Sequence, residues 1–126
     1  MTKSIKFLQA KEILEIHKNI IETYGGALGI RSNHLFLSAI AQPEFKIQNK
    51  YVHKNIYLMT AAYLFHLIKN HPFVDGNKRT SVASALLFLT INKTKINITE
   101  KQLTELSLKT ATTKITKEKI AAILKK

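Results

Sequence analysis

The fold of this chain is decided by one stretch, His71-Pro72-Phe73-Val74-Asp75-Gly76-Asn77-Lys78-Arg79-Thr80. It lies between two long apolar runs, at residues 56–68 and 82–91. Such runs are typical of buried helices, so we expect the stretch to be a loop held between two central helices. Asp75 is the only aspartate of the chain, and Arg79 is one of two arginines against eighteen lysines. Where lysine is the default cation, an arginine indicates a need for the planar guanidinium.

Hydrophobic periodicity and capping residues predict helices on both sides of this stretch. The polar segment 44–51 is expected to be an extended loop or a short hairpin, whose exposed edge could hold a segment of another protein. Helices with short connections predict an all-α fold, a compact helical bundle formed by one domain at residues 1–126. The predicted helices span residues 9–24, 33–41, 54–70, 77–91, 100 to just before the threonine-rich segment 110–113, and 117–124.

Composition narrows the classes of protein to which the chain can belong. Of its 126 residues 45% are hydrophobic, which indicates a folded chain. The sequence has no run of about 18 apolar residues, so no membrane span is predicted. The segment after Met1 has no signal-peptide core and cysteine is absent, which favours the cytoplasm. The net charge is +12, but the lysines are scattered and do not alternate with aromatic residues. We therefore expect a basic soluble surface or an acidic protein partner, and no direct binding of nucleic acid.

A second loop, at residues 25–32, contains three of the four glycines and the other arginine, Arg31. Either it is an ordinary connection between helices, or it is a flexible wall with Arg31 aimed at a binding site. His17 lies on the apolar face of the first helix and His66 lies in the long central run. For both histidines we favour a packed, structural role over a catalytic one.

The residue types of the central stretch suit a phosphate site. Asn77, Lys78 and Arg79 fall at the start of a helix, where free N–H groups and the helix dipole attract anions. Lys78 and Arg79 add positive charge where a phosphoryl group builds negative charge. Asp75 can hold Mg²⁺ beside the phosphates, and His71 can act as a general base. Phe73 is expected to plug the core and lock the loop.

Each of these features also has an ordinary structural interpretation when it is taken alone. An Asp-Gly pair is most often a turn, a histidine after a helix is often a cap, and polar residues at a helix start are usually solvated surface. Their concentration within ten residues, with the only aspartate of the chain, favours the functional interpretation.

The pattern His71-x-Phe73-x-Asp75-Gly76-Asn77-Lys78-Arg79 resembles the signature of the Fic/Doc family. Lys78 resembles the Doc (death-on-curing) branch, because the Fic branch has a glycine there, whereas Gly76 stands where some Doc proteins have alanine. The similarity extends to other segments of the chain, including His17, Tyr24-Gly25-Gly26, Gly29-Ile30-Arg31, and residues 37–43.

This resemblance implies a small all-α toxin of a type II toxin–antitoxin pair. It implies a kinase that transfers the γ-phosphoryl group of ATP to a threonine of elongation factor Tu, which stops translation. The alternative within the family is a Fic-type transfer of AMP to a target hydroxyl. A lysine at position 78 fills space that a phosphate would otherwise occupy, which offers a reason for the nucleotide to bind in the reverse orientation.

The resemblance also assigns roles to residues. It implies His71 as the base, with Lys78 and Arg79 as further catalytic residues and Asp75 as the Mg²⁺ ligand. The nucleotide-binding residues that we expect are Gly76, Asn77, Lys78, Arg79 and Arg31. No serine or threonine has a glutamate four residues later, so the chain lacks the inhibitory pattern of some Fic proteins. Control is therefore expected from a separate, Phd-like antitoxin, an acidic segment that folds on binding.

A third hypothesis is a basic helical binding module without catalysis. It predicts that His71→Ala leaves growth arrest intact, whereas both enzyme hypotheses predict that arrest disappears.

Overall fold

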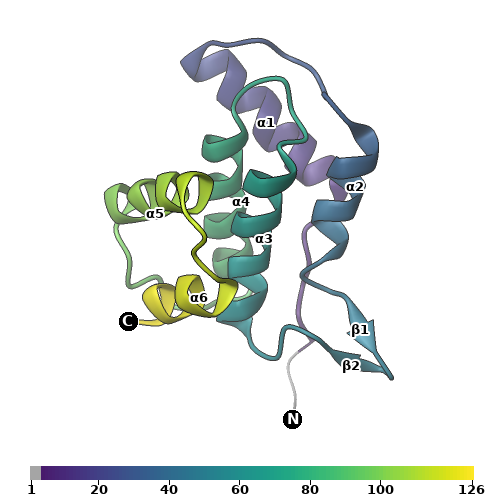
Figure 1. Ribbon diagram of the computed structural model, residues 1–126, viewed down its shortest axis with the longest axis vertical. Coiled ribbons are helices and arrows are strands. Elements are labelled where there is room, and N and C mark those ends of the chain that lie inside the picture. Colours follow the sequence, from purple (N-terminus) through teal and green to yellow (C-terminus); the bar gives the residue numbers. More distant parts are fainter. Residues whose placement is uncertain (1–3) are drawn as a thin grey trace.

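A computed structural model describes residues 4–126, and its elements are helices apart from one small hairpin (Figure 1). Residues 1–3, which belong to the segment tested for a signal peptide, lie outside this range. Within residues 4–126, no helix is long and apolar enough to cross a membrane. The elements are α1 (Ala10–Tyr24), α2 (Asn33–Ala41), β1 (Lys46–Ile47), β2 (Lys50–Tyr51), α3 (Ile56–Asn70), α4 (Asn77–Ile91), α5 (Glu100–Thr112) and α6 (Lys117–Lys125). The expectation of an all-α bundle is confirmed.

Helix α3 is the centre of the bundle, because it is apolar on nearly every side. It packs against α2, α4, α5 and α6, and α4 also packs against α1 and α5. Two hydrophobic clusters lie on opposite sides of this pair, one toward α1 and α2 and the other toward α5 and α6. Figure 1 shows the loop between α3 and α4 at one end of the bundle, beside the connection from α1 to α2. The predicted loop between two central helices is thus confirmed.

Side-chain caps explain where the helices begin. The hydroxyl of Ser32 accepts the N–H of Leu35, as predicted for α2. Thr99 and Gln102 form the predicted capping box of α5. Helix α3 begins at Ile56 instead of the predicted residue 54, because the side chain of Asn55 accepts the N–H of Leu58 and caps it.

The prediction that α5 ends before the threonine-rich segment is wrong. The helix continues to Thr112, where the hydroxyl of Thr110 donates to the carbonyl of Leu106 and that of Thr112 to the carbonyl of Leu108. These hydroxyls hydrogen-bond back along the helix and do not break it.

The segment after α2 forms the short hairpin that was one of two expectations. Strands β1 and β2 pair antiparallel, with Lys46 opposite Tyr51 and Ile47 opposite Lys50. Gln48 and Asn49 make the turn at φ values of 51° and 64°, a left-handed conformation that asparagine tolerates well.

Candidate active site

The loop between α3 and α4 changes direction through two left-handed residues. His71 follows the last residue of α3 at φ 49° and ψ 56°, an uncommon conformation for a residue other than glycine. Gly76 precedes α4 at φ 78° and ψ 18°, where glycine is favoured. A Cβ atom at Gly76 would also make a tight contact of 3.2 Å with the Cδ1 atom of Ile21, so the positive φ is the main reason for a glycine here.

Asn77 holds the loop closed. Its Oδ1 atom accepts the N–H of Phe73 and its Nδ2 atom donates to the carbonyl of Phe73, both at 2.9 Å. The residue is buried, so these bonds satisfy both polar atoms of the amide away from water. Asn77 thereby fixes the shape of the loop, and its predicted contact with a nucleotide stays a prediction.

Phe73 anchors the same loop in the core, and the expectation that it plugs the core is confirmed. Its side chain is fully buried between the rings of His17 and Phe36. His17 is also buried, and its Nε2 atom lies 2.8 Å from the carbonyl oxygen of Asp75. His17 is therefore the packed, hydrogen-bonded histidine that the sequence suggested.

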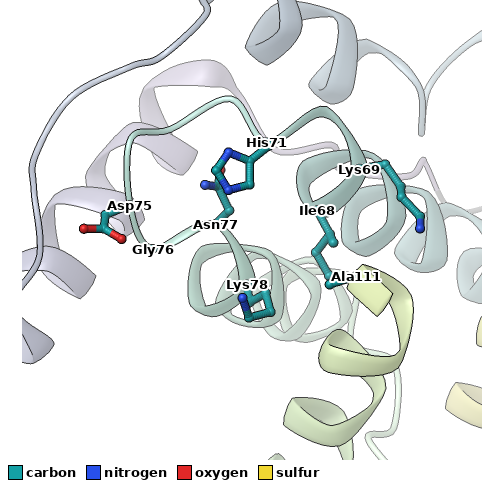
Figure 2. Close-up of a pocket in the computed structure, with 8 residues that line it drawn as sticks. All are labelled: Ile68, Lys69, His71, Asp75, Gly76, Asn77, Lys78 and Ala111. Carbon is teal, nitrogen blue, oxygen red and sulfur yellow. The ribbon is translucent and has the colours of Figure 1, made fainter. Parts of the chain in front are cut away.

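A cleft of about 270 Å³ opens beside this loop (Figure 2). His71 and Lys78 are exposed at its surface, and Figure 2 shows both side chains near the start of α4. The free N–H groups at that end of α4 can bind an anion, and Lys78 adds positive charge there. The cleft is lined by Ile68, Lys69, His71, Asp75, Gly76, Asn77, Lys78 and Ala111.

Asp75 lines the cleft, but its carboxylate lies toward the glycine loop. Its Oδ2 atom accepts the N–H of Ala27 at 3.1 Å, and Figure 2 shows the carboxylate pointing away from His71. A Cβ atom at Gly26 would lie 3.2 Å from this Oδ2 atom, and the φ of Gly26 is 114°, so a larger residue would disturb the contact.

Asp75 is a single carboxylate, and residues 4–126 contain no group of three or more histidine, cysteine or acidic side chains that could hold a metal ion. Magnesium often takes only one or two carboxylates and completes its shell with water and phosphate oxygens. Because the carboxylate of Asp75 is turned toward Ala27, it fits this ion only if it turns toward phosphates bound at the start of α4.

The two arginines lie outside the residues that line the cleft. The guanidinium carbon of Arg79 is 3.9 Å from the ring centroid of Tyr24, which is a cation–π contact. Arg31 donates from Nε to the carbonyl of His71 at 2.7 Å and from Nη2 to the carbonyl of Asn70 at 2.9 Å. No residue of the glycine loop lines the cleft, and Arg31 donates to backbone carbonyls at the end of α3.

Three residues that line the cleft, Ile68, Lys69 and Ala111, were not predicted as site residues, and Ile68 was expected only as part of the apolar run. Lys69 lies two residues before His71, and its ammonium donates to the carbonyl of Thr113 at 3.0 Å. Its position at the end of a central helix was a usable signal. Ala111 comes from α5, and nothing in its local sequence distinguishes it.

The chain is similar to known proteins over a range that contains the loop between α3 and α4. Residues 7–89 match the sequence model of the Fic/DOC family, a range that includes α1 to α3, the loop at residues 71–76 and most of α4. The chain is 39% identical over 69 residues to a protein of Mycolicibacterium smegmatis named Toxin Doc, a match that spans 55% of this chain and only 53% of that protein. It is 26% identical over 122 residues to a protein of Escherichia phage P1 named Protein kinase doc, covering 97% of this chain and 95% of that one. Because the family model matches more than half of its residues, this chain belongs to the Fic/DOC family.

Proposed function

We propose that the chain is the toxin of a toxin–antitoxin pair and acts as an ATP-dependent protein kinase. The observation that carries this proposal is a single cleft that contains the imidazole of His71, the ammonium of Lys78 and the start of α4. The similarity to Protein kinase doc of phage P1 along nearly the whole chain supports the choice of phosphoryl transfer.

In this proposal His71 is the general base. The target hydroxyl attacks the γ-phosphorus of ATP and its proton passes to the imidazole. The new oxygen–phosphorus bond forms while the bond from the γ-phosphorus to the bridging oxygen breaks, and ADP leaves. The products are a phosphorylated side chain, ADP and a proton on His71.

The remaining residues of the loop neutralise and orient the phosphates. Lys78 and the N–H groups at the start of α4, beginning with Asn77, supply positive charge and donors, and Gly76 leaves the backbone open to a close approach. Arg79 supplies a second cation once its side chain leaves the ring of Tyr24, which is exposed and can release it. Asp75 would hold Mg²⁺, which supplies charge neutralisation at the phosphate oxygens.

The proposed substrate is a threonine of elongation factor Tu, and the proposed inhibitor is an acidic, Phd-like antitoxin encoded beside the toxin. The net charge of +12 suits an acidic partner. Proteins of both kinds act in the cytoplasm, which is the proposed location.

The alternative reaction is the transfer of AMP, and isotope position separates the two. The purified chain is incubated with Mg²⁺, elongation factor Tu and ATP labelled at the α- or the γ-phosphorus. Label from the γ position on the factor is the expected result, whereas label from the α position would replace kinase by AMP transfer.

A matched pair of variants tests the role of the cleft. His71→Ala is expected to lower transfer by at least about 100-fold, the usual contribution of a general base, and to abolish growth arrest. His34→Ala removes an exposed histidine of α2 and is expected to change neither. Growth arrest by the His71→Ala protein at normal expression would instead support the noncatalytic binding module.

A further inference from the structure

Three consecutive carbonyl groups at the end of α3 receive hydrogen bonds from one residue. Arg31 donates from Nη2 to Asn70, from Nε to His71, and from its backbone N–H to Pro72, at 2.9, 2.7 and 2.6 Å. The last carbonyls of a helix have no partner within the helix, so they need donors from elsewhere. Here a single residue from a loop 40 positions away supplies donors to the backbone around His71.

The chemistry of these contacts requires arginine. A cation is favoured at the carboxyl end of a helix, where the dipole is negative. The planar guanidinium presents two N–H groups in a fixed geometry that meets two neighbouring carbonyls, whereas a lysine ammonium is a point charge. Such charge-assisted bonds are shorter and stronger than those between neutral groups.

These hydrogen bonds surround a residue with an unfavourable backbone conformation. His71 is left-handed at φ 49°, a conformation that a residue other than glycine keeps only when its surroundings hold it. The N–H of Ser32 also donates to the carbonyl of Pro72, at 3.1 Å. The segment Arg31–Ser32 therefore holds backbone carbonyls both before and after His71. This backbone sets the direction of the Cα–Cβ bond of His71 and therefore the region that its imidazole can reach.

We infer that Arg31 is a positioning residue, which holds the backbone of His71 so that the imidazole faces the cleft. Arg31 is absent from the lining of the cleft, and its Nε and Nη2 atoms donate to carbonyl groups, so we assign it to the backbone of the loop in place of the expected direct contact with the nucleotide. The kinetic part of its test rests on the proposed function, and the spectroscopic part does not.

The kinetic test uses Arg31→Lys, which keeps the positive charge and removes the planar guanidinium with its two fixed donors. The expected result is a fall in kcat of about 10- to 100-fold, the scale that a small misplacement of a catalytic group produces, with the KM for ATP changed by less than about threefold. A raised KM with unchanged kcat would overturn the inference and make Arg31 a nucleotide ligand.

The control is Asn70→Ala. Its Nδ2 atom donates to the carbonyl of Leu35 at 3.0 Å and so ties the same helix end to α2 without contacting the carbonyl of His71. This variant is expected to lose stability while keeping the kcat of the wild type per folded molecule. An equal fall in kcat for both variants would show a general loosening of the helix end and would overturn the specific role.

The spectroscopic test needs no activity. The imidazole resonances of His71, assigned among the five histidines with a His71→Gln variant, are followed by NMR in the folded protein. Arg31→Lys is expected to shift or broaden them, and Asn70→Ala is expected to leave them in place. Unchanged His71 resonances in folded Arg31→Lys would overturn the inference. Absence of any transfer by the wild type would defeat the proposed function alone, and the resonances would still decide the role of Arg31.

Discussion

His17 lies flat against Phe73, with ring centroids 3.8 Å apart and planes inclined by 8°. The Nε2 atom of the same ring is 2.8 Å from the carbonyl oxygen of Asp75. A carbonyl oxygen only accepts, so Nε2 carries the proton and donates it. A residue of α1 thus holds both the apolar anchor of the loop and the backbone of its carboxylate residue, and the first helix becomes part of the support of the cleft.

The first prediction concerns this support. His17→Leu is expected to lower the free energy of unfolding by about 2 kcal/mol, because the partly buried carbonyl of Asp75 loses its donor and Phe73 loses a stacked ring. Urea unfolding followed by circular dichroism measures the change. His34→Leu, at an exposed site of α2, is the control and should stay within about 0.5 kcal/mol of the wild type. Equal stability of the two variants would contradict the supporting role of His17.

The second prediction separates two uses of Asp75. Asp75→Asn keeps a side-chain oxygen that can accept the N–H of Ala27 but loses the negative charge. We expect a stability close to that of the wild type and a loss of Mg²⁺-dependent transfer of about 100-fold or more, because the charge that would hold the ion is gone.

Asp75→Ala is the companion variant, since it removes the charge and the acceptor together. It should lose transfer to the same extent and unfold at lower urea concentration. If Asp75→Asn kept full transfer with unchanged Mg²⁺ dependence, the carboxylate would serve only to hold the glycine loop.

The third prediction follows from a cluster away from the cleft. The ammonium of Lys117 lies 3.0 Å from the Nε2 atoms of both His53 and His66. Burial, then Lys117, then His53 lower the pKa of His66 from 6.5 to about 4. Burial and Lys117 likewise lower the pKa of His53, while a hydrogen bond with the backbone of Gln42 and then the charge of Glu118 act in the opposite direction. An ammonium only donates, so both imidazoles accept in their neutral form.

The sign of the pH dependence follows from these pKa values. Between pH 6.5 and about 4 the unfolded chain binds a proton at His66 that the folded chain does not, so stability falls as the pH falls through this window. Urea midpoints at several pH values measure the slope. His66→Gln removes one titrating group and should flatten the dependence, whereas His34→Gln should keep the slope of the wild type. A His66→Gln protein with an unchanged slope would place the acid sensitivity elsewhere.

Part of this fold could be predicted from the sequence alone. The bounds of α4, the cap at Ser32 and the burial of Phe73 follow from local patterns, because helix periodicity and caps depend on residues within a few positions. The role of Asn77 does not follow in this way. An amide at a helix start can bind a ligand or its own backbone, and only the folded loop brings the N–H and carbonyl of Phe73 within 2.9 Å of it.

Arg31 shows the same limit at longer range. Its scarcity among lysines indicated correctly that a planar guanidinium was needed, but the choice between phosphate and carbonyl oxygen depends on where α3 ends. The cluster of Lys117 with His53 and His66 joins three segments that are far apart in sequence, and no spacing predicts it.

The last prediction concerns the reaction itself. Lys78 is exposed at the second position of α4 and lines the cleft, where we expect its side chain to exclude a phosphate. Lys78→Gly opens space there, so we expect transfer of label from the α-phosphorus of ATP to rise relative to the γ-phosphorus. Lys78→Ala should act similarly, which separates the loss of the side chain from the added backbone freedom of glycine, a cost of about 1 kcal/mol within a helix. Lys101→Gly changes the equivalent second position of α5, remote from the lining of the cleft, and should keep the labelling ratio of the wild type. If both Lys78 variants transferred only γ-label at a reduced rate, the lysine would act as a phosphate ligand, and its bulk would not be what sets the orientation of the nucleotide.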